Sequence, residues 1–169
     1  MDISDESEGL DFDPGYIEGL EEEFPNMLSE GYRPTSQPSD KPNCIGWALY
    51  DYNQYWDPSM IGVRGYYWPP GAPRNDSLES WTKVFEIHGY QICENAQLES
   101  DSEKIATYVT ADGVPQHVAR QRRSGKWISK LGKGADIEHV TLSAISGELA
   151  NKASRLKLLP FFFVRSTTP

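Results

Sequence analysis

Hydrophobic residues recur at helical spacing in three parts of the first half of the chain. Residues 14–23 predict one short helix, and residues 44–55 begin a second. The clearest helix spans 76–88, with a capping-box-like start and Gly89 as its stop. The apolar faces consist of Ile45, Ala48 or Leu49, and Tyr52 in the second helix, and of Leu78, Trp81, Val84 and Phe85 in the third. Between these two helices, the four prolines and three glycines of 56–75 predict a rigid, irregular loop.

Alternating hydrophobic and polar positions replace the helical spacing from Tyr90 onward. Short runs separated by turn residues predict strands over 90–94, 103–110, 116–123, 126–132 and 156–165. The last run is expected to close the sheet, and Pro160 predicts that it lies at an edge or contains a bulge. Helices followed by antiparallel strands indicate an α+β domain.

Charge is distributed unevenly along a chain whose formal net charge is −9. Residues 1–30 carry eleven acids and no Lys or Arg, which predicts a mobile acidic arm ahead of a single domain over 31–169. The domain contains a basic hairpin, on which the arm is expected to dock within the molecule. Its cations are Arg120, Arg122, Arg123, Lys126, Lys130 and Lys133. Six scattered cations in a net acidic protein argue against a nucleic-acid partner.

Length, composition and cysteine content exclude several classes of protein. A length of 169 residues suits one domain, and the absence of a long apolar run predicts no membrane-spanning helix and no membrane partner. The acidic start does not fit a signal peptide, and two cysteines do not make a disulfide scaffold. We therefore expect a cytoplasmic protein. Delivery by a dedicated secretion system is compatible with these features. Cysteine and histidine spacing fits no zinc motif, and no glycine-rich phosphate loop is present, so neither a metal nor a cofactor is expected.

Cys44 carries the strongest chemical signal. Asn43 is a preferred N-cap residue, so Cys44 is expected in the first helical turn, where free backbone N–H groups favour a thiolate and can hold an oxyanion. Gly46 leaves the surroundings of the sulfur uncrowded. In the other interpretation Cys44 is a small buried hydrophobe, as Cys93 within its strand pattern is expected to be.

A nucleophilic cysteine needs a base, and the chain has three histidines. His88 ends a helix, which fits a capping role. His117 begins a strand, and the small Ala119 on the same face leaves room for a helix end, so His117 is the predicted base. His139 follows a Gly-Lys-Gly loop and is expected to face the substrate or to support the pair.

Five motifs follow one another between Asn43 and His139: NCIGWAL, YYWPPG, HVARQ, GKWISKLG and DIEH. In this order they resemble an uncharacterised family of small bacterial proteins. They are also similar to the papain-like cysteine hydrolases, particularly the NlpC/P60 and CHAP amidases, in which a cysteine opens a helix and a sheet strand begins with histidine. The resemblance implies a papain-like α+β fold with Cys44 as nucleophile, His117 as general base and reaction at an amide bond.

Two residues are candidates to orient the imidazole. The resemblance points to Ser129 on the next strand, which shares a face with His117 if the hairpin loop has three residues, whereas a two-residue turn places Lys130 there. Asp136, beyond the glycine-rich loop, would accept the second ring N–H on chemical grounds. Rigid loops of proline and aromatic residues make groove walls, and the expected substrate contacts are Asn43, Trp47, Trp68 and His139.

The sequence therefore predicts a cysteine-dependent hydrolase or acyl-transferase that acts on peptide or side-chain amides of a protein or peptide substrate. The alternative is a non-catalytic binding module in which Cys44 and His117 are structural. In that case the acidic arm and the basic hairpin recognise a partner through their charges.

Overall fold

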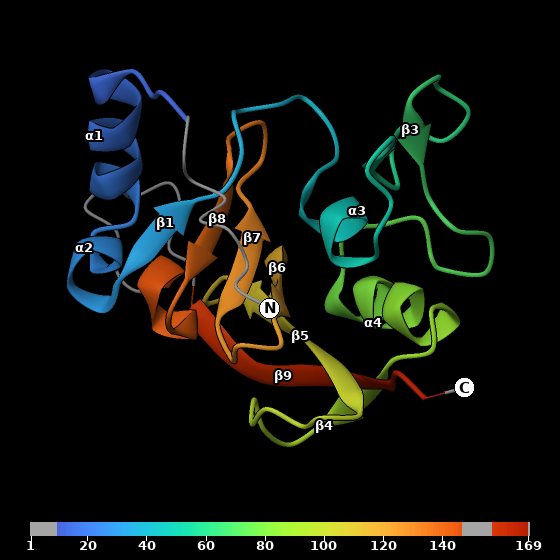
Figure 1. Ribbon diagram of the computed structural model, residues 1–169. Coiled ribbons are helices and arrows are strands. Elements are labelled where there is room, and N and C mark those ends of the chain that lie inside the picture. Colours follow the sequence, from blue (N-terminus) through green and yellow to red (C-terminus); the bar gives the residue numbers. More distant parts are fainter. Residues whose placement is uncertain (1–9, 147–156, 169) are drawn as a thin grey trace.

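The computed structural model describes residues 10–146 and 157–168 and shows a mixed α+β arrangement (Figure 1). The helices are α1 (Pro14–Glu23), α2 (Asn26–Glu30), α3 (Cys44–Ala48) and α4 (Leu78–Ile87), followed by the 3-10 turn η1 (Leu142–Ile145). The strands are β1 (Tyr32–Pro34), β2 (Tyr55–Trp56), β3 (Tyr66–Tyr67), β4 (Gln91–Cys93), β5 (Ser102–Val109), β6 (Pro115–Gln121), β7 (Trp127–Lys130), β8 (Asp136–His139) and β9 (Lys157–Ser166).

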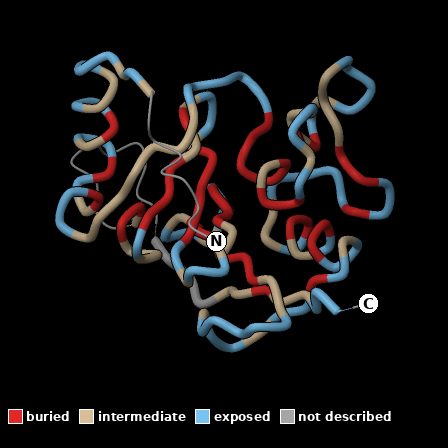
Figure 2. The backbone as a smooth tube through the Cα atoms, in the orientation of Figure 1, coloured by how far each residue is buried: buried red, intermediate tan, exposed pale blue. Residues whose placement is uncertain are grey.

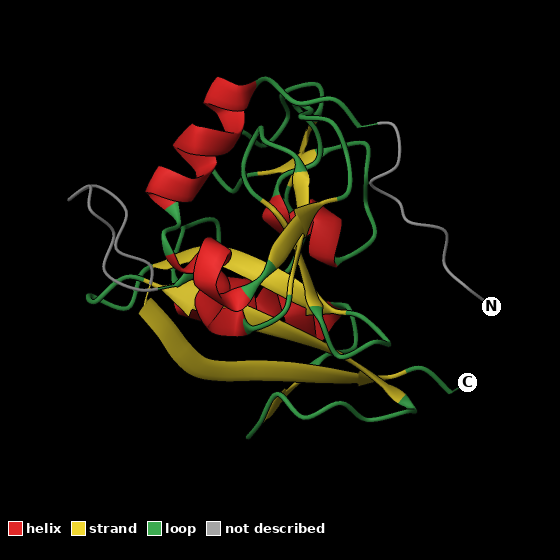
Figure 3. Cartoon of the chain, turned by 60° about the vertical axis from the view of Figure 1, so that its left-hand side comes forward, coloured by secondary structure: helices red, strands yellow, loops and turns green. Residues whose placement is uncertain are grey.

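Within these residues, seven strands form one sheet in the order β1-β8-β7-β6-β5-β9-β4 (Figure 3). Every neighbouring pair in it is antiparallel, so the predicted antiparallel sheet is confirmed. The strands β2 and β3 form a separate, parallel pair within the irregular loop region.

Side-chain alternation across the sheet separates two hydrophobic clusters. Ile105 and Val118 pack with residues of α3 and α4, whereas the adjacent Ala106 and Ala119 pack with residues of α1 and α2. Figure 1 shows the two helix pairs on opposite sides of the central strands. The buried residues gather along those strands and on α3 and α4 (Figure 2). This arrangement leaves the ends of β6 and β7 between the two helix pairs.

The N-terminal segment differs from the predicted arm. The helix predicted over residues 14–23 is confirmed as α1 with the same bounds, and the short helix α2 follows it, although the charge of this region indicated a mobile arm. Leu20, Phe24 and Met27 are buried against the sheet, and this hydrophobic burial outweighs the repulsion among the solvent-facing acids. Residues 1–9 of the predicted arm lie outside the described residues.

Helix boundaries differ from the pattern in two places. The helix predicted from Cys44 ends at Ala48, because Tyr50 adopts a left-handed backbone conformation with φ 64°. The last predicted helix begins at Leu78, with Ser77 as its N-cap accepting from the Ser80 N–H. Asp76 lies just before this helix.

The last strand lies inside the sheet, between β5 and β4. Of the two alternatives that Pro160 predicts, an edge or a bulge, the structure shows the bulge. Pairing with β5 passes from Phe161 directly to Leu158, so Leu159 and Pro160 form the bulge. This position fits proline, which has no N–H for a neighbouring strand.

Candidate active site

Asn43 joins the start of α3 to the strand β2. Its side-chain Oδ1 accepts from the N–H groups of Gly46 and Trp56, and its Nδ2 donates to the Trp56 carbonyl. The predicted N-cap is therefore confirmed, and Cys44 is the first helical residue. Gly46 allows the chain to pass closely, since a Cβ there would lie 2.8 Å from the Asp51 carbonyl oxygen.

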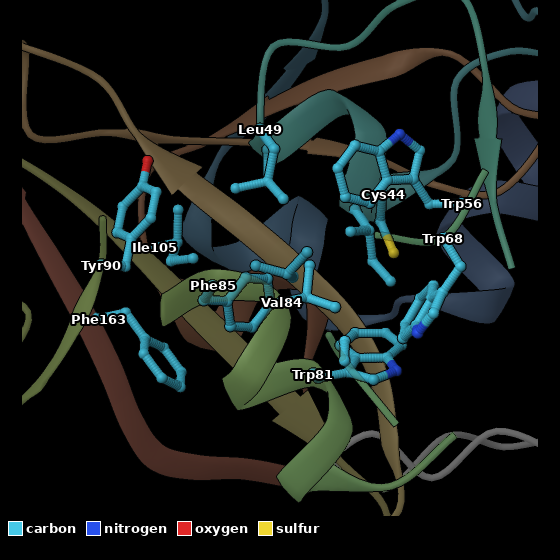
Figure 4. Packing of buried hydrophobic residues seen from close by; sticks show 14 residues of the cluster. Cys44, Leu49, Trp56, Trp68, Trp81, Val84, Phe85, Tyr90, Ile105 and Phe163 are labelled. Carbon is cyan, nitrogen blue, oxygen red and sulfur yellow. The ribbon is translucent and has the colours of Figure 1, made fainter. Parts of the chain in front are cut away.

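The Cys44 thiol is buried, with 9% of the residue exposed. Burial raises its pKa to about 11, although hydrogen bonding from the backbone of Val118, Ile45 and Cys44 itself acts in the opposite direction. The positive charge of Lys130 also lowers the pKa. The sulfur therefore rests as a neutral thiol surrounded by groups that would stabilise its anion. Figure 4 shows the sulfur pointing toward Trp68 and Trp81.

His117 lies on β6 with its ring 5.5 Å from the ring of Tyr108, on the face covered by α1 and α2. It is 5% exposed, and its Nε2 has no hydrogen-bond partner among the described residues. Burial, together with a smaller effect of His139, lowers the pKa of His117 to about 3. The imidazole is neutral, so it can accept a proton.

One cavity, of about 320 Å³, is lined by both Cys44 and His117 at the end of the sheet where β6 and β7 separate. Val118, between the two in space, faces α3 and presents its backbone to the sulfur. No hydrogen bond joins Cys44 to the His117 Nε2 in the described structure. The predicted pair thus shares a cavity without direct contact through that nitrogen.

The residues proposed to orient His117 have other partners. The hairpin register pairs Gln121 with Trp127 and places Ser129 on the face of His117, as the three-residue alternative predicts. The Ser129 hydroxyl, however, lies 2.8 Å from Nε2 of His139. Asp136 pairs in register with Lys130 on the opposite face. Neither residue therefore holds the His117 ring.

His139 is fully buried and does not line the cavity that Cys44 and His117 share, which favours the supporting role over a contact with substrate. Its Nδ1 lies 2.8 Å from the Thr141 carbonyl, which requires that this nitrogen carry the proton. Nε2 is then the acceptor for the Ser129 hydroxyl. Burial lowers the pKa of His139 to about 4, so this pair is a neutral support behind His117.

The predicted aromatic contacts are also placed elsewhere. Trp47 packs under the guanidinium of Arg120, 4.7 Å from the ring centre, and Trp68 is buried with its Nε1 donating to the Pro73 carbonyl. Neither residue lines the cavity that Cys44 and His117 share. Asn43 does line it, but both ends of its amide are engaged within the protein.

Sequence reasoning missed the residues that do form the cavity walls. Besides those already named, these include Tyr55, Trp56, Asp57, Asp76, Trp81 and Gln116. The sequence contained one usable signal for these walls: several of the residues lie at the two ends of the irregular loop, in β2 and at the start of α4. The long-range pairing of Asn43 with Trp56, which brings them together, leaves no local mark in the sequence.

A second cavity, of about 620 Å³, adjoins the first and shares Gln116, His117 and Gly132 with it. Its other wall is α1, where a Cβ at Gly19 would meet no atom within 4 Å. The apolar Leu20, Phe24 and Leu131 line it as well. His117 therefore lies between an aromatic cavity beside Cys44 and an apolar one beneath α1.

The sequence model of one protein family matches residues 33–152, which is more than half of the chain. The chain belongs to that family, a domain of unknown function (DUF7689). No curated protein and no solved structure matches it. The DUF7689 match contains Cys44, His117, Ser129, Asp136 and His139, whereas the wall contributed by α1 precedes it.

No group of three or more His, Cys, Asp or Glu residues in 10–146 and 157–168 has the arrangement of a metal site. Among the helices described for this DUF7689 protein, none combines the length and the apolar character needed to cross a bilayer.

Proposed function

We propose that the chain is a papain-like cysteine hydrolase or acyl-transferase that acts on peptide or side-chain amides. The observation that carries this proposal is the cavity of about 320 Å³ that both Cys44 and His117 line. It brings together a thiol at a helix start and an imidazole whose Nε2 has no hydrogen-bond partner among the described residues. These are the two chemical groups that amide cleavage by a thiol requires.

In the proposed reaction the His117 Nε2 takes the proton of the Cys44 thiol as the sulfur attacks the amide carbonyl. The backbone N–H groups of Cys44 and Ile45, at the start of α3, then stabilise the negative charge on the sulfur and on the carbonyl oxygen. The imidazolium returns its proton to the leaving nitrogen, which gives a thioester on Cys44. Water or an amine resolves the thioester, so hydrolysis and transfer share the same residues.

The protonation states of Cys44 and His117 in the resting site indicate that proton transfer between them begins only when a substrate enters. Burial raises the pKa of the thiol to about 11 and lowers that of the imidazole to about 3, so both groups are neutral at rest and do not exchange a proton. Substrate in the cavity must bring the two groups into contact and stabilise the ion pair for the reaction to proceed.

The same neutral pair favours the second candidate function, a non-catalytic binding module. Fewer cations are open to a partner than the sequence indicates, because several side chains of the basic hairpin interact within the protein. Arg122 and Lys126 pair with Glu138, and Lys130 is fully buried. A binding module would therefore use the cavity walls, and Cys44 would be an inert part of the core.

The pH dependence of Cys44 alkylation separates the two functions. Iodoacetamide labelling would be followed by mass spectrometry in the wild type, His117→Ala and His117→Gln, with Cys93 in the same molecule as the reference thiol. Iodoacetamide carries an amide and enters the cavity as a substrate would, so in the proposed function His117 takes the thiol proton as the sulfur attacks this reagent. Loss of His117 should then slow Cys44 labelling at pH 7 by about tenfold or more, with Cys93 unchanged. Equal Cys44 rates in all three proteins, with a titration near pH 11, would overturn it and support the binding module.

A further inference from the structure

The cavity beside Cys44 has an acidic, aromatic wall. Asp57 and Asp76 line it from two separate segments, one after β2 and one before α4. Among the described residues that line this cavity there is no Lys or Arg. Two carboxylates without a lining cation create a negative potential at the position where a substrate would enter.

Each carboxylate is held through one oxygen. Oδ1 of Asp57 accepts from the Ser59 N–H at 2.8 Å and from its hydroxyl. Oδ1 of Asp76 accepts from Nε1 of Trp81 at 3.5 Å. These bonds orient the carboxylates and leave the second oxygen of each for a ligand.

Aromatic rings form the rest of this wall. Tyr55, Trp56 and Trp81 line the cavity, and the two tryptophans are almost wholly buried. Burial raises the pKa of Tyr55, and its electrostatic interactions with Cys44 and Asp57 raise it further. Aromatic faces combined with carboxylates are the surroundings that recognise ammonium and guanidinium groups.

A second, independent group in the same cavity points to a ligand with N–H donors. His117 is 95% buried and lines the cavity, and its Nε2 has no partner in the described structure. A neutral imidazole accepts an N–H and does not repel a cation. Lys130, whose charge acts on the Cys44 thiol, donates its ammonium to three backbone carbonyls and does not line the cavity.

We propose that the cavity beside Cys44 binds a guanidinium or ammonium group, held by Asp57 and Asp76 against the rings of Tyr55, Trp56 and Trp81. This inference rests on the proposed function for its consequence, which is that the amide attacked by Cys44 belongs to a substrate with a basic side chain. Binding of the cation itself requires no reaction.

Calorimetric titration of the full chain carrying Cys44→Ala tests the inference. The probes are N-acetyl-arginine amide and N-acetyl-citrulline amide, which have nearly the same shape and differ in charge. We expect the arginine probe to bind at least about tenfold more tightly, and its affinity to fall as salt is raised. Asp57→Asn and Asp76→Asn keep the Oδ1 acceptor, and each should weaken arginine binding by about three- to tenfold.

Glu79→Gln is the matched control, since Glu79 is exposed, lies one turn from Asp76 and does not line the cavity. It should change arginine affinity less than about twofold. Equal affinity for the two probes, no binding of the arginine probe, or equal effects of the Asp and Glu variants would each overturn the inference.

The two proposals fail in different measurements. If Cys44 labelling ignores His117 while Cys44→Ala still prefers arginine over citrulline, the catalytic function fails and the cation site stands. If labelling depends on His117 while the protein binds both probes equally, the cation site fails and the catalytic function stands.

Discussion

Lys130 is a buried cation whose removal should destabilise the fold severely. It is 0% exposed, and its ammonium donates to the carbonyls of Ser39, Gly132 and Gly134, each at 2.7 Å. These bonds tie the loop before α3 to the loop between β7 and β8, which carries the cavity residue Gly132. Lys130→Met keeps most of the aliphatic stem and removes all three donors.

The expected loss in the free energy of unfolding is about 3 kcal/mol. Hydrogen bonds from a charged group contribute about 1.5–3 kcal/mol each, so three bonds set an upper limit well above this value. Two effects reduce it. Burial of the ammonium carries a desolvation cost that lowers the pKa of Lys130. Ser39 and Gly132 are exposed, so water can reach their freed carbonyls.

Urea unfolding followed by tryptophan fluorescence measures this loss, and Lys126→Met is its matched control. Lys126 lies on the same hairpin, its side chain is 47% exposed, and its ion pair with Glu138 is 3.5 Å long. Such pairs contribute less than about 1 kcal/mol. The urea midpoint should therefore fall much further for Lys130→Met, with an unchanged slope. A difference below about 1 kcal/mol between the two variants would refute the structural role assigned to Lys130.

Two further predictions concern stability. Gly46→Ala should lower the free energy of unfolding by about 2 kcal/mol or more, because the new Cβ would lie 2.8 Å from the Asp51 carbonyl oxygen and 2.9 Å from Cβ of Pro42. Gly19→Ala in α1 should instead raise the free energy of unfolding by about 0.5–1 kcal/mol, because a Cβ there meets nothing within 4 Å. Thermal unfolding of both variants checks these opposite signs, and two shifts of the same sign would contradict them. Folding lowers the pKa of His117 to about 3 and of His139 to about 4, so the unfolded chain binds more protons below its own histidine pKa of about 6.5. Stability should therefore be fully present above about pH 6.5 and fall on acidification toward pH 4, by up to about 1.4 kcal/mol per pH unit for each histidine. Urea titrations at pH 7 and 4.5 measure the fall, which should be smaller in His139→Gln; an equal fall in that variant would exclude His139 as a source.

Local sequence signals predicted the start of the site well. Asn43 before Cys44 defines a helix N-terminus through interactions only three residues long, and the alternating runs of the second half predict antiparallel strands. The helix over 14–23 was predicted as well, but the packing of α1 and α2 against the sheet was not, because charge dominates the composition of these helices. Their burial depends on a few apolar residues that meet a distant sheet, such as Leu20 and Phe24.

The partners of His117 depended on information that the local pattern lacks. Hairpin length alone places Ser129 on the correct face, but whether its hydroxyl meets His117 or His139 depends on the pairing of β7 with β8. Trp47 and Trp68 were misplaced for a similar reason. Composition predicts an aromatic wall, whereas the direction of each ring is determined by partners such as Arg120 and the Pro73 carbonyl.

His117 lies between the two cavities, and this position determines its chemical properties. Its neighbours Gln116 and Gly132 belong to both cavities, so the imidazole has the acidic, aromatic space beside Cys44 on one side and the apolar space beneath α1 on the other. The low pKa of this histidine follows from burial in that position. Residues 33–152 supply both Cys44 and His117, whereas α1, before the family match, supplies part of the cover. A change in α1 would therefore alter the hydration and basicity of His117 without touching the thiol.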